Sequence, residues 1–244
     1  RSNTKVIYVE SPGSHTFEIS DIPAISREAH NSNIKVVMDN TWGAGYFFQP
    51  FEHGVDISIQ AATKYYVGHS DAMIGTVSMS GENIQPILDS AQILGQHISP
   101  DDAYIALRGL RTLHVRLKRH ETSALKVAKW LSTKPEIEQV LHPALPSSPG
   151  HDLWRRDFNG SNGLFSVIFK TKKEKAIHAF IDQLKLFSLG GSWGGYESLV
   201  LPTNVTRTET EWKKNKQCIR FHIGLEDPDD LIMDISNSMK YLQD

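Results

Sequence analysis

The sequence has a single cysteine, no long apolar run and almost no net charge, and each absence excludes a class of protein. Cys218 is the one cysteine among 244 residues. It cannot form an intrachain disulfide, which suits a reducing compartment such as the cytoplasm. No run of ~18 apolar residues occurs, so we expect no transmembrane helix. The formal net charge of −2 gives no reason to expect nucleic acid or a membrane surface as a partner.

Metal-binding spacings are absent as well. The 11 histidines are scattered, with neither a His-Glu-x-x-His nor a Cys-x-x-Cys motif, so we predict no metal site. What remains is the composition of an ordinary globular protein, 39% hydrophobic and 22% charged. A chain of this length can bury one large core or two smaller ones.

The first part of the sequence alternates between short apolar runs and one amphipathic helix. Asp21 is placed to cap that helix, which carries Ile22, Ile25 and Ala29 on one side. We predict strands over residues 5–9, 34–38, 55–61 and 72–79. This order predicts right-handed crossovers in an α/β unit with a mostly parallel sheet.

The second part predicts a smaller α+β unit. Ser99 is a strong helix cap, Gly109 predicts a break, and a second helix continues to about Leu131. We therefore place the domain boundary near that glycine, with domains over residues 1–110 and 111–244. Further elements are predicted over residues 164–169 (strand), 173–184 (helix) and 219–223 (strand), with a last helix from Asp227.

An acid and an amine follow two of the predicted strands. Asp39 ends the run over residues 34–38, and Lys64 follows the alternation that ends at Ala61. Ligands of open α/β sheets bind outside the carboxyl ends of the strands, so both side chains are placed to face one crevice. A desolvated lysine and a nearby carboxylate meet the needs of a pyridoxal ring. The alternative interpretation is a loop-capping Asp39 and an ordinary surface Lys64.

The sequence around Lys64 is more informative than the spacing between Asp39 and Lys64. Gly54-Val-Asp-Ile-Ser-Ile-Gln-Ala-Ala-Thr-Lys64-Tyr-Tyr-Val-Gly-His-Ser-Asp71-Ala-Met-Ile-Gly resembles the cofactor-lysine segment of the pyridoxal-phosphate enzymes of cysteine and methionine metabolism. The resemblance implies the large domain of an aspartate-aminotransferase-like fold, with pyridoxal 5′-phosphate on Lys64. It further implies that Asp39 pairs with the ring nitrogen and that Thr63 holds the phosphate.

Two later segments extend the resemblance to the substrate site. Arg220, in Ile219-Arg-Phe-His-Ile223, lies opposite the apolar face of its strand and matches the family's substrate-carboxylate clamp. Ser192 and Trp193, in Gly190-Gly-Ser-Trp-Gly-Gly195, match the loop beside that arginine. The family's γ-cleaving members mostly have leucine where Trp193 stands. Together with Ala61, this tryptophan resembles the β-lyase branch.

The resemblance covers essentially the whole chain and implies its activity. A carbon–sulfur β-lyase of this kind cleaves L-cystathionine to homocysteine, pyruvate and ammonia in methionine biosynthesis, and the family is typically homotetrameric. The chain begins at Arg1 without methionine and resembles the carboxyl-terminal part of such an enzyme. We expect the family's phosphate cup and its ring-stacking tyrosine to lie upstream, so the segment alone should bind the cofactor weakly.

Three alternatives stay open. A γ-lyase or γ-synthase of the same family shares most of these motifs, and a non-catalytic scaffold would share the fold. Gly190-x-Ser192-x-Gly194 also matches the nucleophile elbow of a serine hydrolase. An elbow must follow a strand and open into a helix, and Gly194-Gly195 is a poor helix start. Near Lys64, the residues His69-Ser70-Asp71 contain the three residue types of a catalytic triad. We interpret them as a loop, because the members of a triad converge in space rather than along the chain.

Overall fold

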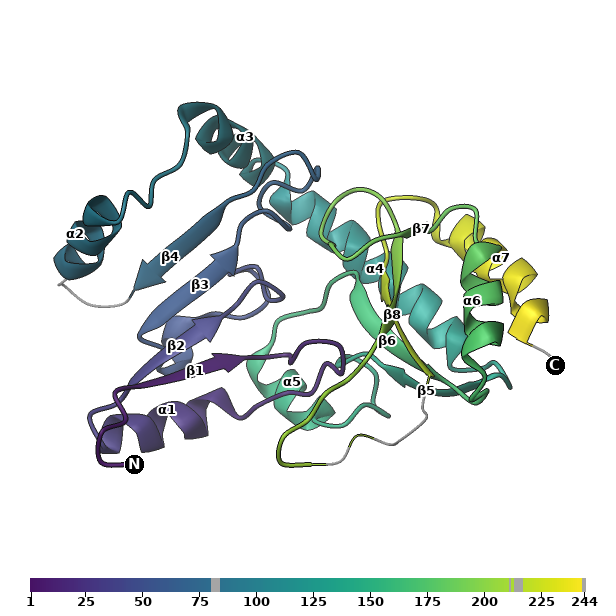
Figure 1. The fold of residues 1–244 in the computed structure, drawn as a ribbon, viewed down its shortest axis with the longest axis horizontal. Coiled ribbons are helices and arrows are strands. Elements are labelled where there is room, and N and C mark those ends of the chain that lie inside the picture. Colours follow the sequence, from purple (N-terminus) through teal and green to yellow (C-terminus); the bar gives the residue numbers. More distant parts are fainter. Residues whose placement is uncertain (80–83, 211, 213–216, 243–244) are drawn as a thin grey trace.

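The computed structural model describes residues 1–79, 84–210, 212 and 217–242, and it contains two separate sheets (Figure 1). The first sheet has the order β1-β2-β3-β4, with β1, β2 and β3 parallel and β4 antiparallel to β3. Its strands are β1 (Val6–Glu10), β2 (Lys35–Asp39), β3 (Ile57–Ala61) and β4 (Gly75–Met79). All four predicted strands of this part are confirmed. The carboxyl ends of β1, β2 and β3 share one edge, where Glu10 lies opposite Asp39.

The predicted helix cap at Asp21 is confirmed. Its carboxylate accepts a hydrogen bond from the Ala24 amide at 3.1 Å and begins α1 (Ile22–Asn31). The buried face of α1 packs with β2 and with the aromatic loop between β2 and η1 (Pro50–His53). This cluster reaches into the second part of the chain through Phe158 and Leu164, so the two parts share a packed boundary.

Three helices follow β4, namely α2 (Gln85–Ile93), α3 (Pro100–Leu110) and α4 (Leu113–Leu131). The hydroxyl of Ser99 caps α3 by accepting from the Asp102 amide at 3.1 Å. The predicted break is confirmed between α3 and α4. A Cβ at Gly109 would lie 2.1 Å from the carbonyl oxygen of Tyr66, so the turn after the lysine packs directly on this helix. Helix α2 was not predicted from the sequence.

The second sheet has the order β5-β6-β9-β8-β7, antiparallel except for the β7–β8 pair. Its elements are β5 (Ile137–Leu141), α5 (His151–Asp157), β6 (Leu164–Phe169), α6 (Glu174–Asp182), β7 (Ser188–Leu189), β8 (Leu199–Thr203), β9 (Gln217–His222), α7 (Pro228–Ser238) and η2 (Met239–Leu242). The strands β6 and β9 and the helices α6 and α7 were predicted, whereas β5, α5, β7 and β8 were not. In Figure 1, α4 runs from the first sheet to the second, where α6 and α7 lie nearby.

The core of the second part confirms the predicted alternation in β9. Ile219, Phe221 and Ile223 lie in one apolar cluster with the helices α4, α6 and α7. Arg220 is therefore turned to the other side of the strand. The division at residues 110 and 111 stays a prediction, because the two parts also pack together through α5 and the loop after it.

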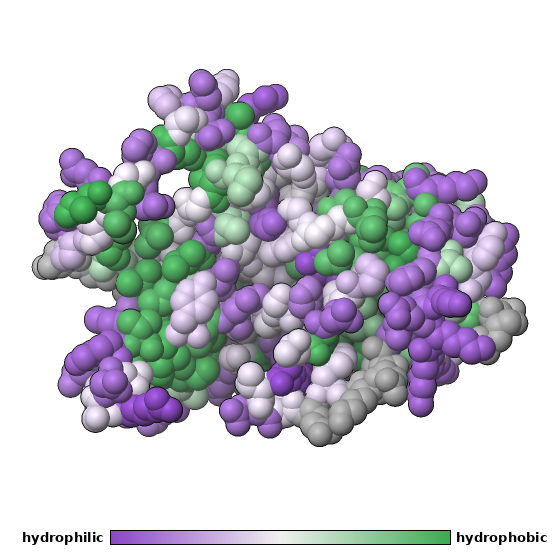
Figure 2. Space-filling model, viewed as in Figure 1, coloured by the Kyte–Doolittle hydropathy of each residue, from purple (hydrophilic) through white to green (hydrophobic). Residues whose placement is uncertain are grey.

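The outer part of the first sheet carries exposed apolar side chains, which Figure 2 shows gathered over that end of the molecule. Val6 on β1 is 52% exposed, and Ile93 at the end of α2 is 84% exposed. Within the described ranges, no helix is both long enough and apolar enough to cross a membrane.

Candidate active site

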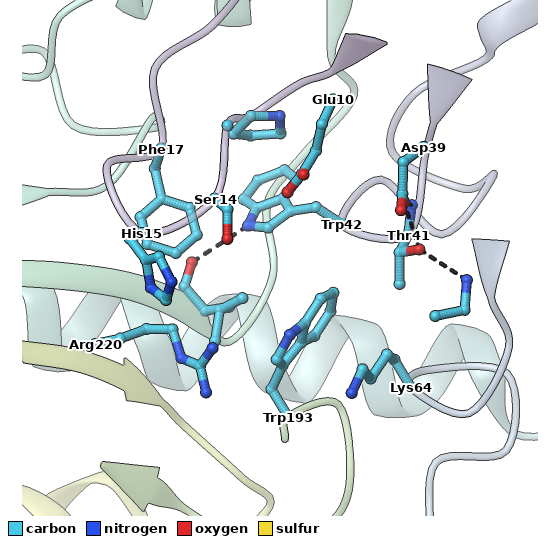
Figure 3. Close-up of a pocket in the computed structure, with 14 residues that line it drawn as sticks. Glu10, Ser14, His15, Phe17, Asp39, Thr41, Trp42, Lys64, Trp193 and Arg220 are labelled. Atoms are coloured by element: carbon cyan, nitrogen blue, oxygen red, sulfur yellow. Dashed lines mark hydrogen bonds between the residues drawn. The ribbon is translucent and has the colours of Figure 1, made fainter. Parts of the chain in front are cut away.

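A cavity of about 160 Å³ opens between the carboxyl edge of the first sheet and the β9 side of the second. Its walls come from the ends of β1, β2 and β3 and the loops after them, from the start of β6, from the loop of residues 190–195, and from β9. The lining residues are Glu10, Pro12, Gly13, Ser14, His15, Phe17, Asp39, Thr41, Trp42, Ala61, Lys64, Leu164, Trp193 and Arg220. Four of the six predicted site residues, Asp39, Lys64, Trp193 and Arg220, therefore share one cavity (Figure 3).

Asp39 is held by donors on one of its two oxygens. Its Oδ1 accepts from the Thr41 amide at 2.9 Å and from the Thr41 hydroxyl at 2.6 Å. The same hydroxyl accepts from the Ala61 amide at 2.8 Å, which ties the end of β2 to the end of β3. Across the described part of the chain, Oδ2 has no hydrogen-bond partner. The carboxylate is thus oriented, and one of its oxygens remains available to a ligand.

Lys64 lies on a turn three residues beyond β3, with its amine directed to the 190–195 loop. The amine donates to the Ser192 hydroxyl at 2.9 Å and lies 5.6 Å from the centroid of the Trp193 ring. Burial, helped by the charge of Arg220, lowers the pKa of the Lys64 amine below its ordinary value. A lysine in this condition is more readily neutral, and so more nucleophilic, than an exposed one.

Arg220 is buried to 7% exposure and is held by the backbone of the 190–195 loop. Its Nη2 donates to the carbonyl oxygens of Gly191 at 2.9 Å and Ser192 at 3.1 Å, with a longer contact to Gly190 at 3.4 Å. Burial lowers the pKa of this guanidinium from its very high ordinary value, and arginine keeps its charge there. No carboxylate of the described residues pairs with it, so the cation is free for a carboxylate from outside.

Thr63 and Ser192 are the two predicted residues that do not line the cavity, and within the described part of the chain Thr63 forms no hydrogen bond with a residue that does. The Thr63 hydroxyl donates to the Ile74 carbonyl at 3.2 Å and accepts from the Ile74 amide at 2.8 Å. These bonds join the lysine turn to the segment before β4. Its role as a phosphate ligand stays a prediction, and in this arrangement its hydroxyl is already occupied.

The structure adds three site residues that the sequence reasoning missed: Glu10, His15 and Thr41. Burial and the neighbouring Asp39 raise the pKa of Glu10, while burial and Arg220 lower the pKa of His15. Glu10 ends β1 as Asp39 ends β2, so the rule about strand ends could have found it. His15 and Thr41 lie in loops whose paths follow from packing, and no motif marked them.

Ser192 lacks the partners that a serine nucleophile needs. Its hydroxyl accepts from Lys64, and the residues after it form no helix. His222, the histidine that would serve as the base of such an elbow, contacts the backbone of Gly194 and Gly195 instead of the serine. The nucleophile-elbow interpretation therefore has neither its helix nor its base.

Comparison with known proteins gives one family. The profile of the family described as Cys/Met metabolism PLP-dependent enzyme matches residues 1–240. Cystathionine beta-lyase MetC of Escherichia coli is 48% identical over 241 residues, and cystathionine beta-lyase of Haemophilus influenzae is 47% identical over 241. Each alignment covers 96% of this chain and 61% of the relative. A cystathionine gamma-lyase of Mus musculus is 39% identical over 246 residues, covering 97% of this chain and 62% of that protein.

Solved structures agree with the sequence comparison. The crystal structure of cystathionine gamma synthase from Xanthomonas oryzae pv. oryzae superposes with a TM-score of 0.91 at 31% identity, covering 98% of this chain and 64% of that one. This likeness confirms the predicted α/β fold. The chain spans about three fifths of the length of the curated relatives it matches.

Proposed function

Because the chain belongs to the family of pyridoxal-phosphate-dependent enzymes of cysteine and methionine metabolism, we propose that it acts as a carbon–sulfur β-lyase on L-cystathionine. The products are homocysteine, pyruvate and ammonia. One observation carries the proposal: a half-buried amine, an oriented carboxylate and a guanidinium with no paired acid line the same cavity. These are the groups that an amino-acid substrate and a pyridine cofactor require.

The residues present fit pyridoxal 5′-phosphate, the cofactor of this family. Lys64 supplies an amine whose pKa is lowered by burial, suited to a covalent link with an aldehyde. Asp39 keeps Oδ2 available for a protonated ring nitrogen, because Thr41 occupies Oδ1. When bound there, the cofactor supplies an electron sink for the charge left on the substrate's Cα.

The Lys64 amine is also the group placed to move the proton at Cα. Burial lowers the pKa of this amine below its ordinary value, which favours the neutral form that can accept a proton. The Ser192 hydroxyl, which accepts from this amine at 2.9 Å, directs it to the loop of residues 190–195. The direction of the amine is therefore set by the loop of residues 190–195.

Arg220 is proposed to bind the substrate carboxylate. Its Nη2 is held by carbonyl oxygens of the loop, which fixes the plane of the guanidinium while the other nitrogens remain available. A planar, immobilised guanidinium can take a carboxylate through two hydrogen bonds. In Figure 3, the Trp193 ring is seen between Arg220 and Lys64, and its centroid lies 5.6 Å from the Lys64 amine.

The choice of β- over γ-cleavage rests on Trp193 and Ala61 together with the similarity to β-lyases. A bulky indole beside Lys64 narrows the cavity, and the bond that breaks is the Cβ–S bond next to the deprotonated carbon. The homocysteine thiolate leaves, and water then releases pyruvate and ammonia. The alternative is a γ-lyase or γ-synthase, supported by the likeness to the mouse and Xanthomonas proteins.

Several features of the whole enzyme are part of the proposal. The cavity of about 160 Å³ is smaller than the ~300–1,000 Å³ usual for ligand sites, and we propose that residues outside this chain complete the site for cofactor and substrate together. We propose that Thr63 or residues outside the described part hold the phosphate. We further propose that the whole enzyme is a homotetramer in the cytoplasm and serves methionine biosynthesis. Its domains in this chain would span residues 1–110 and 111–244.

Reductive labelling tests the proposal at its covalent step. The protein is soaked with pyridoxal phosphate and reduced with borohydride, and the modified peptide is identified by mass spectrometry. We expect the label on Lys64 and a yellow protein before reduction. Labelling of surface lysines with Lys64 unmodified would refute the cofactor assignment and favour a non-catalytic scaffold.

Two matched variants sharpen the result. Lys64→Arg should abolish the specific label, while Lys35→Arg should keep it, because Lys35 pairs with Asp56 on the surface away from the cavity. Product analysis then separates the two cleavages: cystathionine yields pyruvate from a β-lyase and 2-oxobutyrate from a γ-lyase. In a protein of the relatives' full length, a Lys64 label without either product would leave the cofactor assignment standing and refute the lyase.

A further inference from the structure

The loop of residues 190–195 brings Ser192 and Trp193 to the Lys64 amine, yet its own backbone supplies almost nothing to hold it there. Gly190 donates to the Val200 carbonyl at 3.1 Å, which is the last contact with the sheet. Among the described residues, no backbone–backbone hydrogen bond involves residues 191–195. Gly191 and Ser192 are exposed, whereas Gly194 and Gly195 are buried. Since buried backbone polar groups need partners, side chains must supply them at the two buried glycines.

Arg220 and His222, two residues apart on β9, hold the loop through hydrogen bonds to its backbone. Arg220 donates to the carbonyl oxygens of the first half of the loop, Gly191 and Ser192. His222 serves the second half: its Nε2 lies 3.1 Å from the Gly194 amide nitrogen and 3.1 Å from the Gly195 carbonyl oxygen. Residues two apart on a strand project from the same face, so one strand holds both halves of the loop.

The histidine can hold the loop in either neutral tautomer. With the proton on Nδ1, its Nε2 accepts from the Gly194 amide; with the proton on Nε2, it donates to the Gly195 carbonyl. The ring is 1% exposed, and burial together with the neighbouring His120 lowers its pKa to about 3, which keeps it neutral. Accepting from the Gly194 amide requires this neutral form, whereas donating to the Gly195 carbonyl requires only a proton on Nε2.

The part of the loop that His222 contacts packs against the backbone of Lys64. Gly194 has a φ of +82°, and a Cβ there would lie 2.9 Å from the carbonyl carbon of Lys64. Trp193, the preceding residue, packs edge-on against Tyr65 with the ring centroids 5.5 Å apart. Any release of the loop at Gly194 would therefore move Ser192 and Trp193 away from the amine.

We propose that His222 is a positioning residue, which binds the backbone at Gly194 and Gly195 and thereby keeps Ser192 and Trp193 at the Lys64 amine. It touches neither the amine nor the substrate-binding guanidinium through a hydrogen bond. The placement of the loop is independent of the cofactor, whereas its consequence for turnover rests on the proposed function.

Hydrogen–deuterium exchange on the protein without added cofactor tests the placement. In His222→Leu, the backbone of Gly194 and Gly195 loses its side-chain partner. We expect the exchange of the peptide containing residues 191–195 to rise about tenfold, the effect of one ordinary hydrogen bond. His142→Leu is the matched control: that ring is also buried and neutral, but it contacts the Ala144 amide, outside the loop. It should leave exchange in the loop unchanged.

A conservative pair keeps the test decisive where His222→Leu fails to fold. His222→Gln places an amide at the position of Nε2 and should retain protection of the loop. His222→Asn reaches only to the position of Nδ1 and should lose it. Equal protection in the Gln and Asn variants, or an equal rise of loop exchange in His142→Leu, would overturn the proposal.

Turnover provides a separate readout. In the cofactor-loaded protein, His222→Asn should lower kcat/KM about tenfold relative to His222→Gln, in step with loop exchange. Wild-type protein of the relatives' full length that lacks lyase activity would refute the proposed function, and the exchange experiment would still decide the role of His222. Unchanged kcat/KM with an opened loop would overturn the link between the loop and the amine.

Discussion

Gly194 lies where the 190–195 loop crosses the lysine turn, and Gly194→Ala is expected to force the two apart. The φ of +82° is in the left-handed region, which costs an L-residue about 1–2 kcal/mol. The new Cβ would also lie 2.9 Å from both the carbonyl carbon and the Cβ of Lys64. Carbon atoms prefer separations of about 3.5–4.0 Å, and neither of these Lys64 atoms can turn away.

The backbone strain and the steric clash of Gly194→Ala should affect different measurements. The backbone cost persists whatever the loop does, so urea unfolding should show a loss of about 1–2 kcal/mol in the free energy of unfolding. The clash is relieved by moving the loop, which breaks the hydrogen bond from Lys64 to Ser192. We therefore expect reductive labelling of Lys64 and pyruvate release to change more than the modest loss of stability alone would explain.

Gly191→Ala is the control within the same loop. A Cβ at Gly191 meets no atom within 4 Å, and its φ lies outside the left-handed region. The alanine should leave labelling unchanged and should leave stability equal or raised by up to about 1 kcal/mol, through a less flexible unfolded chain. If both alanine variants unfold at the same urea concentration and show equal labelling of Lys64, the contact between the loop and Lys64 contributes nothing to the free energy of unfolding.

Three further predictions concern buried cations and histidines. Arg116→Met should lower the free energy of unfolding in urea by about 3 kcal/mol, because the carbonyls of Tyr65 and Gly109 lose the guanidinium that donates to each at 2.8 Å. An unchanged free energy of unfolding would contradict this. Burial lowers the pKa of His142 to about 4 in the folded protein. The unfolded chain therefore binds a proton first as pH falls below 6.5, and stability is lost towards pH 4. His142 should account for about 2 kcal/mol of the loss between pH 7 and 5, so His142→Leu should show a shallower pH slope, and an unaltered slope would count against it. Arg220→Lys should raise KM for cystathionine at least about tenfold, because an ammonium cannot hold the loop carbonyls and a carboxylate in one plane, and an unchanged KM would exclude Arg220 as the carboxylate site.

Much of the fold could be predicted because local chemistry decides it. Asp21, Ser99 and Asp227 cap helices through their own side chains, and such caps act within three residues of the chain. Alternation in β9 separated Arg220 from the apolar core. The strands β5 and β8 were missed. Their signal is weak, since Pro202 interrupts β8 and Glu138 lies within β5.

The site was predictable in its charged members and not in its loops. Asp39 and Lys64 follow strands, so the rule that ligands bind at the carboxyl edge of a sheet places both in one crevice. His15 and Thr41 reach the same cavity along loops. Thr63, next to the lysine in sequence, is turned to Ile74 instead.

By itself, the sequence determined the strands of the first sheet, the capped helices and the strands β6 and β9. It also placed Asp39 and Lys64 after parallel strands and showed which family the lysine segment resembles. These properties depend on neighbours along the chain. Only the tertiary structure decided that the Arg220 guanidinium binds the loop carbonyls, that His222 holds Gly194 and Gly195, and that the Ser192 hydroxyl meets the Lys64 amine across 128 residues of sequence. Contacts of that separation depend on how two sheets pack together, which no local pattern of residues records.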